Sequence, residues 1–339
     1  MARSGFITAG TWCVDRNITV EQWPNEDLSA RVVDMQLSGG GSGCNFAMDI
    51  KRLDPEMNVE TTSLLGAGEN GDFLIELAQE AGIRHRFTRS TQAATQSTDA
   101  YFSQASQRRT HILFMGVAPL LTPDHLVFDD STARILHLGL PGVHEKMDAP
   151  WGTDENGWVT TLKRARQSGL ETNLELLSVE AATVARLALP CLPYLDTLII
   201  NDYEAGALTG RPCVTDGVTD LSNCARAAQD IIERGAMSCV AVHSVIGAVC
   251  VDRTGACHAK PSVMVPSDAH RGANGAGDAF AAGFLYAWHQ GEAIADCLTL
   301  AHATAASCLR SPSASGGIGT MADCLNLAAT WGWRDLAAI

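Results

Sequence analysis

The chain has 339 residues, of which 46% are hydrophobic and 18% charged, so it is long enough to bury the core of one large α/β domain. Its net charge of −14 argues against a nucleic-acid partner, and the lack of any run of about 18 apolar residues argues against a membrane span. Its 11 cysteines, an odd number without a C-x-x-C pair, predict reduced thiols in a cytoplasmic protein.

The first 116 residues alternate between buried and half-exposed strand patterns. Residues 5–13 have the pattern of a buried strand, whereas residues 14–23 and 31–37 alternate as half-exposed strands do. We then expect a glycine-rich turn, a helix, a buried strand, a second helix and two more exposed strands, at residues 39–43, 44–53, 61–65, 71–81, 98–103 and 109–115.

From residue 135 onward, apolar strands alternate with helices, the strands at residues 135–140, 172–177, 197–200, 239–243 and 249–252 and the helices at residues 158–167 and 225–233. This alternation predicts an α/β fold with a doubly wound, mostly parallel sheet and helices on both faces. The early exposed strands do not fit that sheet. We therefore expect one domain over residues 1–339, with the strands of a small β-sheet lid inserted at about 14–38 and 97–116.

The segment GANGAGDAF, residues 272–280, begins a predicted helix. Its small residues Gly275, Ala276 and Gly277 stand where the first amides of a helix have no partner within the helix. Small side chains let an anion approach these amides, and the positive end of the helix attracts it. The three residues therefore form a candidate anion hole.

Asp278 lies in the first turn of the same predicted helix. For binding alone, a carboxylate beside a phosphate is unfavourable because like charges repel. A carboxylate is useful there if it accepts the proton of an attacking hydroxyl group during phosphoryl transfer. We interpret Asp278 as the catalytic base, and the alternative is an ordinary first-turn acid on a glycine-rich helix start.

A second glycine-rich segment, GGGSGCN at residues 39–45, ends at another predicted helix start. It lacks the third glycine of a dinucleotide fingerprint and the lysine of a P-loop. Its backbone and its asparagine suit the hydroxyl groups of a polyol, so the candidate substrate-binding residues are Asp15, Gly40, Gly41 and Asn45. Taken alone, the segment is better explained as a turn with an Asn cap.

The segment NDYE, residues 201–204, follows an apolar strand. Ligands of open α/β sheets bind at the carboxyl ends of strands. Asn201 and Glu204 can hold a hydrated Mg²⁺ there, because this ion keeps several of its waters. As a lone motif the segment is more often a helix N-cap with a first-turn acid.

Together and in this order, the three segments resemble the ribokinase-like (PfkB-type) carbohydrate kinase family. LLGAGENGDF at residues 64–73 and NDYEAGALTG at residues 201–210 are also similar to segments of that family, so the resemblance spans nearly the whole chain. It implies a sugar kinase that uses ATP and Mg²⁺ and often forms a homodimer through its lid. The nucleotide-binding residues that it implies are Asn201, Gly247 and Asn274, with Glu204 and Asn201 holding Mg²⁺ through water. His243 is a further candidate for the nucleotide site, and the alternative is a packed histidine.

Four departures from the family pattern are visible. The strand that usually ends in Thr-Leu-Gly near the nucleotide ends here in Val242, His243 and Ser244, with Gly247 retained. Gly272, Ala273 and Asn274 replace the usual Asp-Thr-Thr or Asp-Thr-Asn, and the missing aspartate leaves activation by K⁺ doubtful. Glu175 stands where many members carry aspartate. Members that act on acid sugars often carry an arginine near the position of Met115, and this arginine can bind a carboxylate with two hydrogen bonds. This chain has Phe114, Met115 and Gly116 there and no arginine. We therefore expect a neutral sugar as the acceptor, with a nucleoside as the alternative.

Two other classes of function are alternatives to the kinase. The altered residues around Gly272 and Ser244 would suit a catalytically weak ligand-binding protein on the kinase scaffold, but such a protein gains nothing from Asp278. A dehydrogenase would need a glycine fingerprint after the first strand, and residues 6–15 contain none.

Overall fold

The computed structural model describes residues 3–106 and 108–336, so the ends of the expected range 1–339 lie outside the described residues. Within the described residues the main sheet has nine strands, and every pair from β13 to β5 is parallel. This confirms the expected mostly parallel α/β sheet. In spatial order the strands are β15 (Cys257–Pro261), β14 (Gly247–Asp252), β13 (Cys239–His243), β10 (Thr197–Asn201), β9 (Glu171–Leu174), β8 (Ile135–Gly139), β1 (Phe6–Gly10), β4 (Val59–Gly66) and β5 (Arg84–Ser90).

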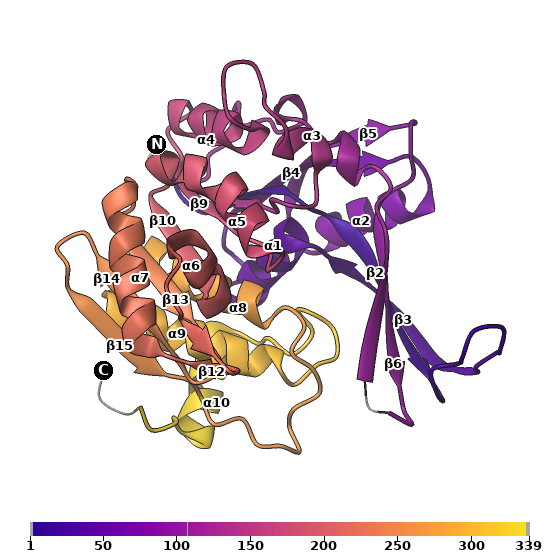
Figure 1. Ribbon diagram of the computed structural model, residues 1–339. Helices are drawn as coiled ribbons and strands as arrows, with labels where there is room; N and C mark the ends of the chain where they lie inside the picture. The colour runs from indigo at the N-terminus through magenta and orange to yellow at the C-terminus, as the bar shows by residue number, and fades with distance from the viewer. Residues whose placement is uncertain (1–2, 107, 337–339) are drawn as a thin grey trace.

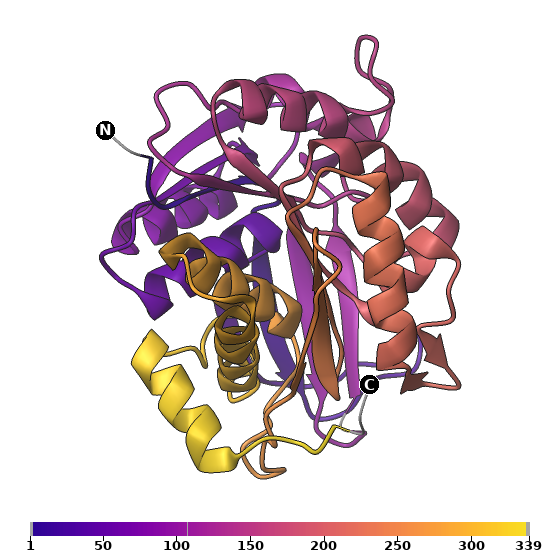
Figure 2. The ribbon, with the colours of Figure 1, turned by 90° about the vertical axis from the view of Figure 1, so that its left-hand side faces the viewer.

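Helices cover both faces of this sheet, as a doubly wound fold requires (Figure 2). Successive side chains of β1 point to opposite faces, so Phe6 packs into one core and Ile7 into the other. The Phe6 core contains α1 (Ser42–Leu53), α2 (Glu69–Glu80), α8 (Ala276–Gln290), α9 (Ile294–Cys308) and α10 (Met321–Trp331). The Ile7 core contains α4 (Gly157–Gln167), α5 (Ala181–Ala188), α6 (Asp202–Thr209) and α7 (Leu221–Arg234).

Short elements complete the described part of the chain. They are a single helical turn, three 3₁₀ segments and a two-stranded hairpin: α3 (Glu145–Asp148), η1 (Ala118–Leu120), η2 (Pro123–His125), η3 (Leu189–Tyr194), β11 (Val214–Thr215) and β12 (Val218–Thr219). In the same residues we find no helix with the length and the apolar surface that a bilayer span needs.

The order of the main sheet reverses at β1, and this reversal positions the ligand-binding edge. β4 and β5 extend the sheet on one side of β1, whereas β8, β9, β10 and β13 extend it on the other. In a doubly wound sheet, ligands bind outside the carboxyl ends of the strands at such a reversal. The residues at or directly after those ends are Thr11, Leu140, Glu175, Asn201 and His243.

A second, smaller sheet projects away from the body beside this edge (Figure 1). Within the described residues it has four strands in the order β3 (Val32–Gly40), β2 (Cys13–Val20), β6 (Ser97–Ser103) and β7 (Arg108–Phe114). β2 pairs antiparallel with β3 and parallel with β6, and β6 pairs antiparallel with β7. That this sheet acts as a lid stays a prediction.

Two local predictions at β3 are corrected by the structure. The glycine-rich turn is shorter than residues 39–43, since β3 continues to Gly40 and α1 begins at Ser42; Gly41, with φ of 85°, makes the connection. The strand is also exposed on both faces, since successive residues from 32 to 37 are all exposed, because the described chain places no second layer over this sheet.

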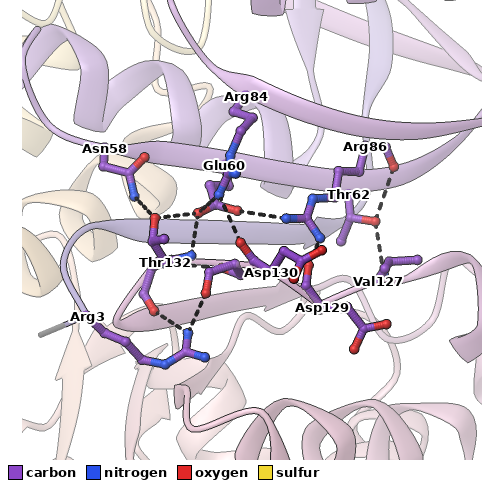
Figure 3. Close-up of polar contacts among 12 residues, drawn as sticks. Arg3, Asn58, Glu60, Thr62, Arg84, Arg86, Val127, Asp129, Asp130 and Thr132 are labelled. Carbon is purple, nitrogen blue, oxygen red and sulfur yellow. Dashed lines mark hydrogen bonds and ion pairs between the residues drawn. The ribbon is translucent and has the colours of Figure 1, made fainter. Parts of the chain in front are cut away.

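A buried carboxylate ties β4 to β5 (Figure 3). Glu60 of β4 is 1% exposed, forms an ion pair with Arg84 of β5 and accepts the backbone N–H of Thr132 at 2.9 Å. Burial alone would raise the pKa of Glu60, but the hydrogen bonds from Arg84 and Thr132 outweigh burial and lower this pKa. Glu60 is therefore ionised at neutral pH and holds the two strands together.

Replacing Glu60 with glutamine is expected to lower the free energy of unfolding at neutral pH by about 1–3 kcal/mol, because glutamine keeps the shape but loses the charged hydrogen bonds. Since the folded-state pKa is lowered, the contribution of Glu60 is present above its unfolded-state pKa and is lost as the pH falls through the folded-state value. Urea unfolding of both proteins from neutral to acid pH should therefore show a difference that shrinks in acid.

The matched control for Glu60→Gln is Asp72→Asn. Asp72 pairs with Arg89 at 2.7 Å, but its side chain is 61% exposed, so its loss should cost less than about 1 kcal/mol. Equal losses for the two variants would contradict a special contribution of the buried carboxylate.

Candidate active site

The N-terminus of α8 carries free backbone amides. Gly275 precedes the helix with φ of 75°, and a Cβ there would lie 2.5 Å from the backbone oxygen of Ala314, so only glycine fits. The amide of Ala276 donates to a backbone carbonyl three residues earlier, at 3.3 Å. Within residues 3–106 and 108–336, no protein group accepts a hydrogen bond from the amides of Gly277 and Asp278. These two amides are available to an anion.

Asp278 lies beside those amides with its carboxyl group turned into a cavity. Its Oδ2 accepts a hydrogen bond from Nδ2 of Asn45 at 2.8 Å, and the carboxyl group of Glu175 is its other close polar neighbour. Burial and then the neighbouring Glu175 carboxyl raise the pKa of Asp278 well above its usual range. The site therefore contains a carboxyl group with an increased affinity for a proton.

The cavity that Asp278 enters has a volume of about 580 Å³ and lies between the small sheet and the carboxyl ends of β1, β8 and β9; we call it the small-sheet cavity. One part of its wall is polar and the other apolar. The polar residues are Thr11, Asp15, Ser42, Asn45, Gln96, Ser97, Thr98, His111, Glu175, Asn274 and Asp278. The larger apolar residues are Leu113, Phe114, Met115, Leu140, Val143, Leu176, Leu177 and Val179.

Three of the predicted substrate-binding residues, Asp15, Gly41 and Asn45, line this cavity, and Gly40 lies against Asp15. Asp15 of β2 is 9% exposed, and burial raises the pKa of its carboxyl group. A Cβ on Gly40 would lie 2.2 Å from Oδ2 of Asp15, so glycine leaves the room that the carboxylate occupies. Gly41 turns the chain into α1, which carries Asn45. The structure thus brings all four residues together.

Two buried polar atoms at this cavity have no hydrogen-bond partner in the described residues. They are Oδ1 of Asn45 and Oγ of Ser42, both on the first turn of α1. Buried polar atoms in native proteins are almost always paired, so unpaired ones at a cavity indicate a ligand with polar groups.

A second cavity, of about 470 Å³, lies on the other side of the α8 N-terminus, and we call it the histidine cavity. Its wall includes Ala276 and Gly277, and a Cβ on Gly277 would lie 3.7 Å from the ring of His243. Burial lowers the pKa of His243 to about 4, so this ring is neutral. Its main lining residues are Asn201, Tyr203, His243, Val245, Val263, Val265, His270, Ala276, Gly277, Phe280, His302, Ala306 and Leu309.

The NDYE segment forms a helix cap at the edge of the histidine cavity. Oδ1 of Asn201 accepts the backbone N–H of Glu204 at 2.8 Å, and Oε2 of Glu204 accepts the backbone N–H of Asn201 at 3.0 Å. Oε1 of Glu204 accepts from Ser178 at 2.9 Å, and burial raises the pKa of this glutamate. Both oxygens keep a free lone pair, so the pair fits an ion held through water; the described residues contain no cluster of three or more metal-ligating side chains.

The remaining predicted residues lie farther apart. Asn274 lines the small-sheet cavity rather than the histidine cavity. Gly247 begins β14, where a Cβ would lie 2.7 Å from the carbonyl oxygen of Lys260, and it is not among the residues that line either cavity.

Sequence reasoning assigned no role to three side chains at these cavities. Glu175 follows β9 directly and lies beside Asp278. Its position at a strand end is like that of Asn201, the last residue of β10, which was predicted as a site residue for that reason. His137 of β8 lies behind Glu175. His302 of α9 is 4% exposed, lines the histidine cavity and has an unpartnered Nε2. A histidine inside an apolar helix gives no sequence signal for such a position.

Comparison with known proteins agrees with this geometry. The profile of the pfkB family of carbohydrate kinases matches residues 7–320. Adenosine kinase from Schizosaccharomyces pombe is 22% identical over 285 residues, which is 80% of each chain. Ribokinase from Arabidopsis thaliana, solved with ribose and ATP, superimposes with a TM-score of 0.77 at 19% identity over 97% of this chain and 99% of its own. For ribokinase from Thermotoga maritima the TM-score is 0.75 at 19% identity, over 96% and 99%. The resemblance seen in the sequence is confirmed, and the chain belongs to the pfkB family of carbohydrate kinases.

Proposed function

We propose that the protein transfers the γ-phosphoryl group of ATP to a hydroxyl group of a neutral sugar, with Mg²⁺ as cofactor. The observation that carries this proposal is the position of the α8 N-terminus between two cavities. Asp278 opens into the small-sheet cavity, whereas Gly277 lines the histidine cavity. A phosphoryl group that passes between the cavities therefore crosses free amides beside one carboxyl group.

In this proposal the acceptor lies in the small-sheet cavity and ATP in the histidine cavity. Asp15 and Asn45 hold the acceptor's hydroxyl groups, and Asp278 takes the proton of the hydroxyl that attacks the γ-phosphorus. The amides of Gly277 and Asp278 stabilise the charge of the transferred group. Mg²⁺, held through water by Glu204 and Asn201, would neutralise charge on the phosphates.

The charge of the small-sheet cavity favours a neutral acceptor. Asp15, Glu175 and Asp278 line it, and its described lining residues include no lysine or arginine. A carboxylate or a phosphate on the acceptor would meet these acids without a cationic partner. The departure at Met115 in the sequence favours the same class of acceptor.

A nucleoside is the second candidate acceptor, because the small-sheet cavity is apolar on one side. Leu113, Phe114 and Met115, at and directly after the end of β7, line it together with Leu140 and Leu176. A free sugar has little surface that gains from such a wall, whereas a nucleobase does. The adenosine kinase among the relatives supports this candidate.

A panel assay tests the proposal and separates the two acceptors. ADP release is measured with ATP and Mg²⁺ for ribose, fructose, adenosine and their phosphorylated or acidic counterparts. We expect turnover with neutral compounds alone; a higher kcat/KM for adenosine than for ribose would identify the nucleoside as the acceptor. Binding in calorimetry without any ADP release would contradict a kinase and support the ligand-binding protein.

We further propose that the protein is a cytoplasmic homodimer joined through the small sheet. Val32, Val33, Met35 and Leu37 of β3 are each between 44% and 58% exposed, a larger apolar surface than one sheet usually leaves in water. All 11 cysteines are free thiols, which supports a reducing compartment.

Replacing Met35 with aspartate is expected to convert the dimer to a monomer, because a charge in the centre of an apolar contact is desolvated without a partner. Sedimentation velocity measures the change. The matched control is Val218→Asp in β12, which also alters an exposed apolar side chain, here 69% exposed, but outside the small sheet. A wild type that sediments as a monomer would contradict the proposed dimer.

A further inference from the structure

Glu175 and Asp278 are a pair of carboxyl groups in direct contact at the floor of the small-sheet cavity. They come from distant parts of the chain, Glu175 directly after β9 and Asp278 from the first turn of α8, and both side chains line the same cavity as neighbours. Two ionised carboxylates that meet in a buried place repel each other, so the pair is stable there when it holds one proton.

A neutral histidine holds Glu175 from behind. Nε2 of His137 lies 2.5 Å from Oε2 of Glu175, while Nδ1 of His137 accepts from Nδ2 of Asn173 at 2.9 Å. Oδ1 of Asn173 in turn accepts from Thr197, which fixes the orientation of its amide. His137 therefore carries its hydrogen on Nε2 and donates it to Glu175. Burial lowers the pKa of His137 to about 4, so the ring does not take the shared proton.

The surroundings of the pair favour the retention of one proton. The other titratable groups that face it are the carboxyl groups of Asp49 of α1, Glu204 of α6 and Asp15 of β2 and the buried thiols of Cys44 and Cys308. Burial, followed by Glu204 and Asp49, raises the pKa of Glu175 to about 7. Gly139 makes room for the glutamate, since a Cβ there would lie 3.3 Å from Cβ of Glu175.

We propose that Glu175 is a positioning residue that shares one proton with Asp278, so that the two carboxyl groups carry one negative charge and act as a single base. The inference rests on the proposed kinase function. An acceptor hydroxyl that donates to Asp278 selects the arrangement with the proton on Glu175. The hydroxyl O–H bond then breaks, its oxygen bonds to the γ-phosphorus as the bond to ADP breaks, and its proton stays on the pair. That proton leaves to water through the cavity, where the Glu175 side chain is 18% exposed.

The pH dependence of kcat with ATP and either ribose or adenosine, whichever has the higher kcat/KM, tests the sharing. Glu175→Gln accepts from His137 and donates to Asp278 as before, but it cannot share a proton. We expect the profile of Glu175→Gln to lose the alkaline limb at which the wild-type pair gives up its shared proton, because glutamine has no carboxyl proton to lose. Its acid limb should stay near that of the wild type, since Asp278 keeps a neutral hydrogen-bond donor beside it. Glu175→Asp, which keeps a carboxyl group, should retain both limbs. An unchanged profile in Glu175→Gln would show a merely structural side chain and would overturn the proposal.

Infrared spectroscopy of the free protein provides a test that needs no turnover. At neutral pH, Glu175→Gln should show one protonated-carboxyl C=O band fewer than the wild type. An equal number of bands would place no shared proton on the pair and would also overturn the proposal. If the panel assay finds no acceptor, the kinase proposal fails, while the infrared result still decides whether the proton is shared.

Discussion

Replacing Asp278 with asparagine is expected to lower kcat by about 100-fold or more, because the attacking hydroxyl group loses its proton acceptor. Asparagine has the shape of aspartate, and its amide oxygen can still accept from Asn45, which now donates to Oδ2 of Asp278 at 2.8 Å. The fold and both cavities should therefore persist. Calorimetry should show that the variant binds ATP and the acceptor with near wild-type affinity, so the loss appears in kcat rather than in KM.

The matched control for Asp278→Asn is Asp296→Asn. Asp296 is the third residue of α9, as Asp278 is of α8, so both substitutions remove an acid from the first turn of a helix. Asp296 is exposed and lies outside both cavities. Its variant should lose less than about 1 kcal/mol of stability and keep full activity. Full activity in Asp278→Asn would remove this aspartate from the mechanism.

The sequence predicted most of the sheet because buried parallel strands leave a local pattern. Continuous apolar runs identified β8, β10 and β13, since both faces of such strands are covered. The sequence RHRFTRS gave no prediction for β5, because an edge strand needs no apolar run and this one is largely exposed or half-buried. α9 was also missed: it is buried on nearly all sides, so its apolar residues lack a helical period.

The residues of the candidate site fall into the same two groups, those that a local pattern predicts and those that only the fold brings together. Gly275, Asp278 and Asn45 could be assigned from short motifs, because a glycine-rich helix start is a local feature of the chain. The proximity of Glu175 to Asp278 could not be predicted from a motif, since it depends on which strand ends lie beside α8. That neighbourhood is set by strand order, which a single sequence does not encode within any one segment.

Asn274 and Gly277, three residues apart, show that the sequence also leaves the direction of neighbouring residues open. Both precede or begin α8, yet Asn274 lines the small-sheet cavity and Gly277 the histidine cavity. A helix N-terminus that separates two cavities turns neighbouring residues into different cavities. The sequence predicted an anion-binding start of the helix, whereas the direction of each residue required the folded chain.

Replacing Asp15 with asparagine is expected to raise the KM for the acceptor by about 10- to 100-fold, as the loss of a hydrogen bond to a buried charge predicts. Asp15 is 9% exposed in the small-sheet cavity, and its carboxylate fills the space that Gly40 leaves open. Because the histidine cavity does not include Asp15, the KM for ATP should change little. Steady-state kinetics with each substrate varied in turn measures the two constants separately.

The matched control for Asp15→Asn is Asp99→Asn in the neighbouring strand β6. Asp99 pairs with Arg16 at 2.5 Å on the same small sheet, and it does not line the small-sheet cavity. Its variant should keep both KM values, so a general weakening of the sheet is distinguished from the loss of one acceptor contact. Equal effects of Asp15→Asn on ATP and on the acceptor would contradict the assignment. The acceptor would then have to be held by Asn45 and Ser42 alone, whose unpaired oxygens are neutral and therefore weaker partners for hydroxyl groups.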